Sequence, residues 1–453
     1  MSADAEPQAA GADEARGFRR ALGPFDAAMV VVGGIIGAGI FINPYIVAQR
    51  LDSSALVLAA WVVGGAIAMA GALSFAELGS LFPQARGQYV YLRKAFHPLV
   101  GFLFGWALLF MIEGGATAAI AITFAEYTLR FLGRDVASTP LAVSAIAIVA
   151  TVNYLGVKPG SRLLNVFVVL KILALGVLIA AGALMPAGAR RPDALAVGGA
   201  AFPALAFGAA LIPVMFSYGG WQKVNQLAEE LRRPRRDMPI AIVAGTTVVV
   251  LIYLLVNVVY LRALGHDGLA GTLTPAADTA RLAFGARGDR LIALGIAIST
   301  FGYLNLSALA PTRVYFAMAA DGIFFQSVAK LHPRWRTPSV AIVIQSGWAI
   351  LLTLTGTFAQ LVDTVVFADW IFFGLTAAAV FVFRKQYPLS ERPAGSFRTP
   401  GYPVLPALFV AAAVVIVVSV LVSNPIRSVV GALLLLTGLP AFLWWRRRNA
   451  ESS

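Results

Sequence analysis

Long apolar runs, each about the length needed to cross a lipid bilayer, dominate this 453-residue chain. A hydrocarbon core about 30 Å thick requires about 20 apolar residues in a helix, and Pro, Gly or clustered charge separates runs of that size. Twelve such runs have the approximate bounds 27–48, 55–78, 99–124, 141–154, 163–184, 202–222, 240–260, 291–318, 340–355, 361–383, 404–422 and 429–445. None alternates apolar and polar residues as a transmembrane strand would. We therefore expect an all-α polytopic membrane protein with 12 transmembrane helices.

The composition excludes several other classes of protein. Hydrophobic residues make up 59% of the chain and charged residues 13%, whereas soluble domains carry about 25% charged residues. The chain has no cysteine and three scattered histidines, His97, His266 and His332, which argues against thiolate metal sites and redox chemistry. We expect no cofactor and no bound metal.

The basic residues predict the orientation in the membrane. Lys and Arg number 35 against 22 Asp and Glu, an excess that would suggest nucleic acid in a soluble protein but indicates cytoplasmic loops here. A cytoplasmic N-terminus leaves about twice as many Lys and Arg residues inside as outside. The polar tail 1–26 lacks a signal-peptide cleavage pattern. We therefore expect no nucleic-acid partner, both termini in the cytoplasm, and a short C-terminal tail at 446–453.

Four glycines interrupt the first apolar run near its middle. They are Gly33, Gly34, Gly37 and Gly39, and each costs about 1 kcal/mol in a helix interior. The spacing of Gly33 and Gly37 also fits a close-packing face between helices, but packing alone does not require Gly34 and Gly39. We expect the helix to unwind here, which lipid tolerates only where freed backbone groups line a cavity.

The sixth run carries a second interruption, with Pro213 followed by the segment 216–222 (Phe-Ser-Tyr-Gly-Gly-Trp-Gln). Breaks at matching positions of two five-helix units are typical of transporters built from inverted repeats. We expect repeats at 27–184 and 202–384, followed by two helices in 404–445. The half-helix after Gly39 would direct N–H groups at an anion, while carbonyls near Ile35 and from Ser217 to Gly219 suit a cation. A zwitterionic amino acid carries both charges.

Four stretches in order along the chain resemble one known family. They are 33–41 with Pro44, 75–79 continuing to Tyr91, 216–221 followed by Glu229, Glu230 and Pro234, and 367–374. Together they resemble the amino acid, polyamine and organocation superfamily, in particular its L-type amino-acid transporter branch and bacterial relatives. The resemblance implies a 5+5 inverted repeat of the LeuT type. It also implies that no partner subunit is joined by a disulfide, since cysteine is absent.

The resemblance assigns roles to residues of both breaks. It implies that the backbone N–H groups of Gly37, Ala38 and Gly39 hold the substrate carboxylate and that carbonyls near Ile35 and Gly219 hold its ammonium. Relatives often have Ser at the Ala38 position, so only the backbone part of that role is carried over. Phe216 would act as the gate that covers bound substrate from outside.

Two ionisable residues lie deep in predicted helices. Lys171 is about 12 Å from the cytoplasmic end of its helix, and a lysine at such depth normally faces a cavity and has a partner. The resemblance implies that it reaches the unwound first helix, where sodium-coupled cousins bind sodium, so that transport is sodium-independent. Glu113 is expected to face the pocket as a proton carrier or as a counter-charge for a cationic side chain. A structural hydrogen bond is the alternative.

Polar residues elsewhere could complete the pocket or only join helices. Gln222 and Asn305 are candidates for substrate contact. Ser299 and Thr300 supply hydroxyls that a sodium site would need. Asp369 is expected to be structural, and Glu77 to pair with loop arginines.

These features predict a permease that moves L-amino acids across the inner membrane by alternating access, either as an exchanger or with protons. Neutral amino acids are the expected substrates, because the lining offers little side-chain charge apart from Glu113. A cationic amino-acid or polyamine carrier using Glu113, or a non-transporting amino-acid sensor, are the alternatives. An enzyme is not expected, since no nucleophile and base face each other and no phosphate-binding loop is present.

Overall fold

The structure, a computed structural model, describes residues 22–83, 87–155, 160–184, 202–335, 337–388 and 390–452. Most of the predicted N-terminal tail and the connection 185–201 lie outside the described residues. All regular elements of the described residues are helices, and the single β-bridge among these residues links Leu22 to Leu231.

The first half of the chain folds into helices that follow the predicted apolar runs. They are α2 (Pro24–Ile35), α3 (Gly39–Arg50), α4 (Ser54–Leu81), α5 (Gln88–Ala95), α6 (Pro98–Ala107), the π-helical turn η1 (Leu108–Ile112), α7 (Glu113–Leu132), α8 (Thr139–Tyr154) and α9 (Gly160–Leu184).

The second half continues the pattern with longer helices. They are α10 (Ala204–Tyr218), α11 (Lys223–Gln226), η2 (Ala228–Glu230), α12 (Pro234–Ala270), α13 (Pro275–Leu309), α14 (Thr312–Ala320), η3 (Gln326–Ala329), α15 (Ser339–Thr355), α16 (Phe358–Gln386), α17 (Val404–Ser423), α18 (Pro425–Leu436) and α19 (Gly438–Ser452). The predicted C-terminal tail therefore continues a helix as far as Ser452.

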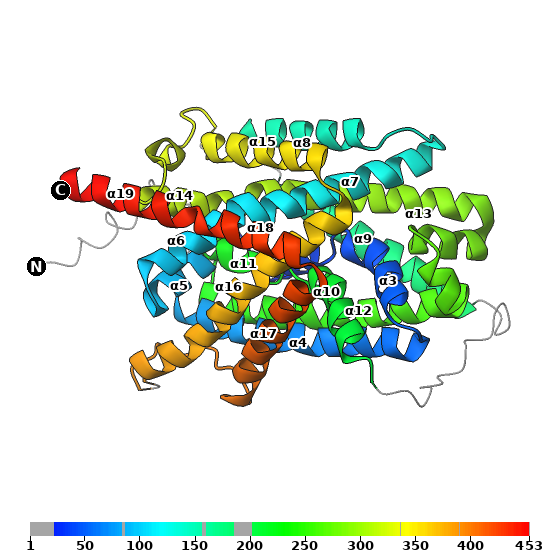
Figure 1. Ribbon diagram of the computed structural model, residues 1–453, viewed down its shortest axis with the longest axis horizontal. Helices are drawn as coiled ribbons and strands as arrows, with labels where there is room; N and C mark the ends of the chain where they lie inside the picture. Colours follow the sequence, from blue (N-terminus) through cyan, green and yellow to red (C-terminus); the bar gives the residue numbers. More distant parts are fainter. Residues whose placement is uncertain are drawn as a thin grey trace, which may run out of the picture.

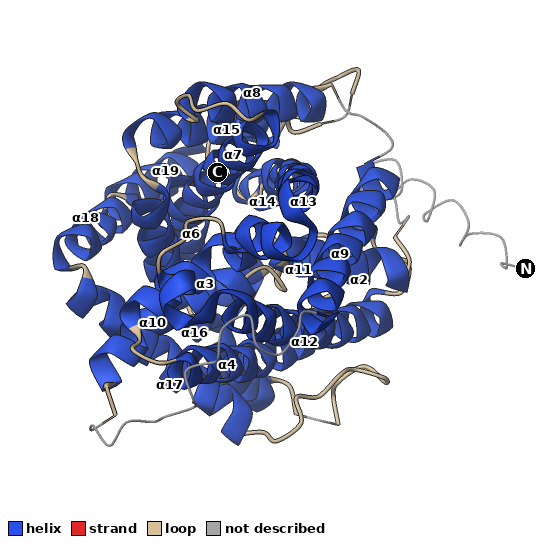
Figure 2. Cartoon of the chain, turned by 90° about the vertical axis from the view of Figure 1, so that its right-hand side faces the viewer, coloured by secondary structure: helices blue, strands red, loops and turns tan. Residues whose placement is uncertain are grey.

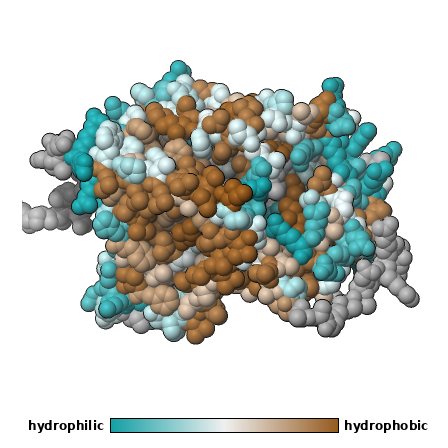
Figure 3. Space-filling model, in the orientation of Figure 1, coloured by the Kyte–Doolittle hydropathy of each residue, from teal (hydrophilic) through white to brown (hydrophobic). Residues whose placement is uncertain are grey.

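Nine helical segments of the described chain are long and apolar enough to cross a membrane, and the apolar helices α8, α10 and α15 are shorter. The surface agrees with this: a broad apolar belt covers the middle of the molecule, and hydrophilic residues gather at its two ends (Figure 3). Large side chains such as Leu205, Leu291 and Ile426 are strongly exposed, as expected where lipid rather than water is the neighbour. The protein is a multi-pass membrane protein.

The long helices run roughly side by side (Figure 1), and a view along them places α3, α10 and α11 inside the bundle with α18 and α19 at its edge (Figure 2). α12 packs against both α2 and α4, and α13 packs against α7 and α9. The interrupted helices are thus enclosed by continuous ones.

Glu77, near the end of α4, joins the bundle to the segment after α16. Its carboxylate accepts hydrogen bonds from Arg384 at 2.7 and 2.8 Å, from Arg392 at 2.7 Å and from the Thr399 N–H at 2.8 Å. The predicted pairing with loop arginines is confirmed.

Candidate functional site

The two predicted interruptions are present and lie against each other. α2 ends at Ile35 and α3 begins at Gly39, while α10 ends at Tyr218 and α11 begins at Lys223. A Cβ on Gly34 would lie 2.8 Å from the Gly220 carbonyl oxygen, and one on Gly220 would collide with the Gly34 carbonyl. Gly220 also has φ +124°, which side-chain-bearing residues rarely adopt. Glycine is needed at both positions because one backbone passes directly over the other.

Gly39 has a comparable packing role. A Cβ there would lie 2.6 Å from the Ser217 Cα, so α3 approaches α10 as closely as two backbones allow. The expectation that packing does not require Gly34 and Gly39 is therefore wrong. These glycines both weaken the helix and let the broken segments touch.

Side chains from outside the first break satisfy its freed carbonyl groups. The Lys171 ammonium, buried in α9, donates to the Ile36 carbonyl at 2.7 Å. The Tyr253 hydroxyl, from α12, donates to the Ile35 carbonyl at 3.0 Å, and the Gly37 N–H donates to the same oxygen at 2.8 Å. The opposite end of the break is the start of α3, whose first N–H groups have no intrahelical acceptor.

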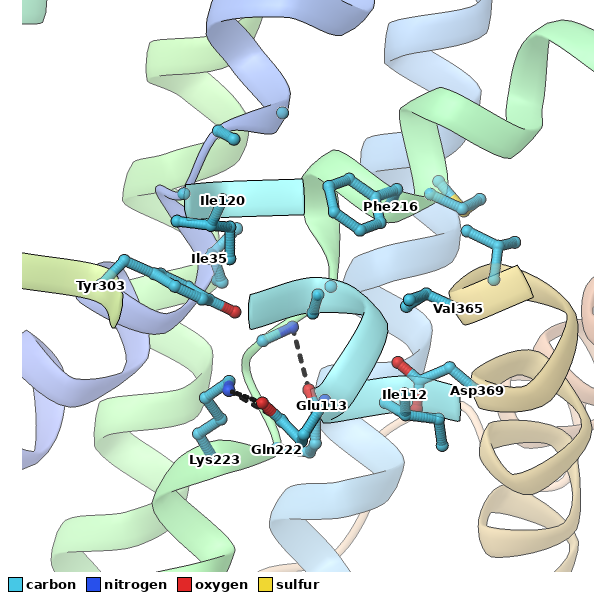
Figure 4. A pocket seen from close by; sticks show the side chains of 18 of the residues that line it. Ile35, Ile112, Glu113, Ile120, Phe216, Gln222, Lys223, Tyr303, Val365 and Asp369 are labelled. Carbon is cyan, nitrogen blue, oxygen red and sulfur yellow. Dashed lines mark hydrogen bonds and ion pairs between the residues drawn. The ribbon is translucent and has the colours of Figure 1, made fainter. Parts of the chain in front are cut away.

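A small cavity lies between the two breaks and helices α7, α13 and α16 (Figure 4). Its lining is mostly apolar with a few polar groups, the usual composition of a small-molecule site. It is formed by Ile35, Gly37, Ala38, Gly39, Ile112, Glu113, Ala116, Ile120, Met215, Phe216, Gly219, Gly220, Gln222, Lys223, Tyr303, Val365, Val366, Asp369 and Trp370.

A buried ion pair lies at one side of this cavity. The Lys223 ammonium is 2.8 Å and 3.0 Å from the two carboxylate oxygens of Glu113 (Figure 4), and the two side chains are 2% and 4% exposed. The Ser307 hydroxyl donates to Glu113 at 2.8 Å and is itself bonded to Thr117 at 2.8 Å. A carboxylate so paired and hydrogen-bonded can remain ionised away from water.

A π-helical turn precedes Glu113. The five residues of η1 run from Leu108 to Ile112, and the indole of Trp348 donates to the Phe110 carbonyl at 2.8 Å. Such bulges occur frequently at functional sites because they redirect the side chains that follow. Here the residue that follows is Glu113.

The sequence is recognised over nearly its whole length by one family: the amino acid permease model matches residues 22–444. This chain belongs to the amino acid permease family. The permease is similar to the serine/threonine exchanger SteT of Bacillus subtilis, with 29% identity over 97% of this chain and 99% of the relative.

Two human proteins are similar at 30% identity. One is the b(0,+)-type amino acid transporter 1, matched over 90% of this chain and 84% of the relative. The other is the large neutral amino acids transporter small subunit 2, matched over 98% and 84%. The permease is accordingly a transporter and not an enzyme.

Most residues predicted to contact substrate line the cavity of the permease. They are Ile35, Gly37, Ala38, Gly39, Glu113, Phe216, Gly219 and Gln222. The Gln222 side chain also accepts the Gly220 N–H at 2.9 Å, so it stabilises the second break from within.

Three predicted residues lie outside the lining. The Ser217 hydroxyl accepts from Asn43 at 2.8 Å and donates to the Pro213 carbonyl at 2.8 Å, facing α3. Asn305 accepts from Asn153 of α8 at 2.8 Å, so it joins helices instead of contacting the cavity. Lys171 is not part of the lining and donates to the Ile36 carbonyl of the first break. Ile35 lines the cavity, but its carbonyl already accepts two hydrogen bonds, which leaves little capacity for a substrate ammonium.

Three polar residues of the cavity were missed by the sequence analysis or assigned a different role. Lys223 and Tyr303 are not among the residues singled out from the sequence, and Asp369 is expected there to be structural; all three line the cavity. The Tyr303 ring centre is 5.1 Å from the Lys223 ammonium and 5.8 Å from that of Lys171. A lysine directly after a helix break was the signal available in the sequence.

Proposed function

We propose that this permease transports L-amino acids, principally neutral ones, without sodium, by alternating access. The main support is the cavity, which both broken helices line and in which the charges of Glu113 and Lys223 neutralise each other. The printed names of the relatives, a serine/threonine exchanger and a large neutral amino-acid transporter subunit, agree with this substrate class.

The start of α3 is the proposed binding site for the substrate carboxylate. The residues Gly37, Ala38 and Gly39 line the cavity, and the first turn of α3 combines free N–H groups with the positive end of the helix dipole. Lys223 is a less suitable partner for the substrate carboxylate, because its ammonium already contacts both carboxylate oxygens of Glu113. The substrate ammonium would then turn toward the carbonyl end of α10, near Gly219.

The Glu113–Lys223 pair supports a neutral side chain in the substrate. A cationic side chain would have to displace the Lys223 ammonium from a contact of 2.8 Å, which leaves one of two cations without a partner in a low-dielectric site. The cationic-substrate alternative based on Glu113 is therefore weaker than it was from the sequence.

Lys171 supports sodium independence. Its side-chain nitrogen already donates a hydrogen bond to the Ile36 carbonyl, and the Thr300 hydroxyl donates to the Ile296 carbonyl at 2.8 Å. A sodium ion bound beside the first break would compete with Lys171 for the Ile36 carbonyl and would have to reorient the Thr300 hydroxyl.

The proposed membrane arrangement follows the sequence prediction. Twelve spans would form two five-helix inverted repeats at 27–184 and 202–384 and a final pair at 404–445, with both termini in the cytoplasm and the protein in the inner membrane. Phe216, which lines the cavity, would cover the substrate from outside.

Counterflow in proteoliposomes tests this function. Protein-mediated exchange of a radiolabelled neutral amino acid, competed by other neutral amino acids and unchanged when sodium is replaced by choline, is the expected result. Uptake that only lysine, arginine or polyamines inhibit would contradict it. Saturable binding without counterflow would identify a sensor instead.

A further inference from the structure

Asp369 is the second carboxylate of the cavity, and it differs from Glu113 in its contacts. It lies in the middle of α16, flanked by the apolar residues Ala368 and Trp370. Its carboxylate points into the cavity beside Ile112 (Figure 4). In the part of the chain that the structure describes, no hydrogen bond or ion pair joins it to another residue.

The two lysines near the cavity make their direct contacts with other groups. The titratable groups that line the cavity with it are Glu113 of α7, Lys223 of α11 and Tyr303 of α13. Lys223 contacts both oxygens of Glu113. Lys171 of α9 is directed at the Ile36 carbonyl. The helices α4, α5, α6, α17 and α18, which also pack on α16, contribute no residue to the lining.

Two carboxylates and one lysine therefore share this side of the cavity. A carboxylate that no cation contacts is costly to hold away from water. The Tyr303 phenol lies across the cavity from Asp369 (Figure 4) and does not supply a positive charge. A proton is the smallest cation that neutralises the site.

We propose that Asp369 is the proton-binding residue of this permease, which makes it a proton–amino acid symporter. The inference rests on the proposed transport function. With the cavity open to the outside, a hydronium ion gives up its proton to the Asp369 carboxylate, forming one O–H bond and leaving water. After the amino acid binds and the cavity opens inward, that O–H bond breaks and the proton passes to cytoplasmic water. One positive charge crosses with each zwitterion.

Asp369→Asn is the decisive variant, because an amide has the shape and neutrality of the protonated acid. Wild-type proteoliposomes with an acidic exterior should accumulate the amino acid, by up to about tenfold per pH unit at one proton per substrate. The Asp369→Asn protein should equilibrate the amino acid without accumulating it at any imposed pH gradient. Asp363→Asn is the matched control: Asp363 lies on the same helix and pairs with Arg427 at 3.1 Å, so accumulation should persist.

The outcomes separate the two proposals. Absence of counterflow in the wild type would refute the transport function itself. Normal counterflow without a response to the pH gradient, or accumulation by Asp369→Asn equal to wild type, would overturn the role of Asp369 alone. Loss of lysine or arginine uptake in Asp369→Asn, with proton coupling intact, would show a substrate counter-charge and also overturn it.

A second variant covers the case in which Asp369→Asn does not assemble. Asp369→Glu retains a carboxyl group and should accumulate substrate with a shifted dependence on external pH. A pH-sensitive dye inside the liposomes should report acidification when substrate is added to wild type and Asp369→Glu. A glutamate variant that exchanges normally but neither accumulates substrate nor acidifies the interior would contradict the proposal.

Discussion

The two helix breaks meet in one cavity but are stabilised in different ways. The first depends on side chains from other helices, Lys171 and Tyr253, which donate to the Ile36 and Ile35 carbonyls. The second is stabilised by its own Gln222, which accepts the Gly220 N–H. It then continues directly into Lys223, which pairs with Glu113.

This difference assigns separate tasks to the two breaks. Because carbonyls of the first break are already occupied, its unused polarity is that of the N–H groups at the start of α3. The second break contributes a cation to the cavity, and that cation neutralises a carboxylate. The first break is thus suited to hold the carboxylate of an amino acid, and the second to receive its ammonium near Gly219 and to shape the environment of its side chain.

The largest loss of folded, active protein is expected from adding a Cβ where the backbones of Gly34 and Gly220 meet. Gly220→Ala would collide with the Gly34 carbonyl at a φ of +124°, so folded, transport-active protein should be lost. Size-exclusion profiles and counterflow measure this. Gly347→Ala, in the helical α15 where a new Cβ meets nothing within 4 Å, is the control and should be stable. A fully active Gly220→Ala protein would show that the breaks do not cross as described.

The next largest effects are expected from replacing the two buried lysines, which should lower the stability of the protein by different amounts. Lys223→Met leaves Glu113 without a cation and should destabilise the protein by about 3–5 kcal/mol. Lys171→Met leaves one carbonyl unpaired and should cost about 1–3 kcal/mol. Unfolding of the purified proteins in detergent measures both values.

A double variant tests the interpretation of the ion pair. Glu113→Gln combined with Lys223→Met removes both charges and should recover most of the stability lost in Lys223→Met alone, because the two effects are coupled. If the double variant lost the sum of the stabilities lost in the two single variants, the Glu113–Lys223 pair would not be the cause of the destabilisation in Lys223→Met.

Removing one hydrogen bond from each break gives a finer comparison. Tyr253→Phe removes the external donor to the Ile35 carbonyl, which keeps the Gly37 N–H, and should cost about 0.5–1.5 kcal/mol. Gln222→Ala removes the internal acceptor of the Gly220 N–H and should cost about 1–3 kcal/mol. Tyr253→Phe leaves the cavity lining unchanged, whereas Gln222→Ala alters it. The apparent KM for the amino acid should therefore rise more in Gln222→Ala, and the opposite order would contradict the assigned tasks.

The smallest effect is expected at Asn305. Its side chain pairs with Asn153 outside the lining, so Asn305→Ala should change the KM by less than about twofold while lowering stability by about 1 kcal/mol. A substantial change in substrate selectivity would place this residue in the site after all.

The sequence predicted features that arise locally and missed those that arise from packing. Glycine runs and Pro213 marked both breaks because helix interiors disfavour these residues, and the depth of Lys171 indicated a buried partner. The Glu113–Lys223 pair joins residues 110 positions apart, and no local pattern shows which face of each helix the other meets. Asn305 is assigned to the pocket by its polarity and Ser217 by its backbone carbonyl, but the side chains of both residues bond to groups outside the cavity lining.

The most direct test of the shared cavity is a cryo-EM structure with the neutral amino acid that competes best in counterflow. The account predicts ligand density between the two breaks, with the carboxylate on the N–H groups of Ala38 and Gly39 and the Glu113–Lys223 pair intact. Ligand bound outside this cavity, or a carboxylate held by Lys223 after separation from Glu113, would contradict it.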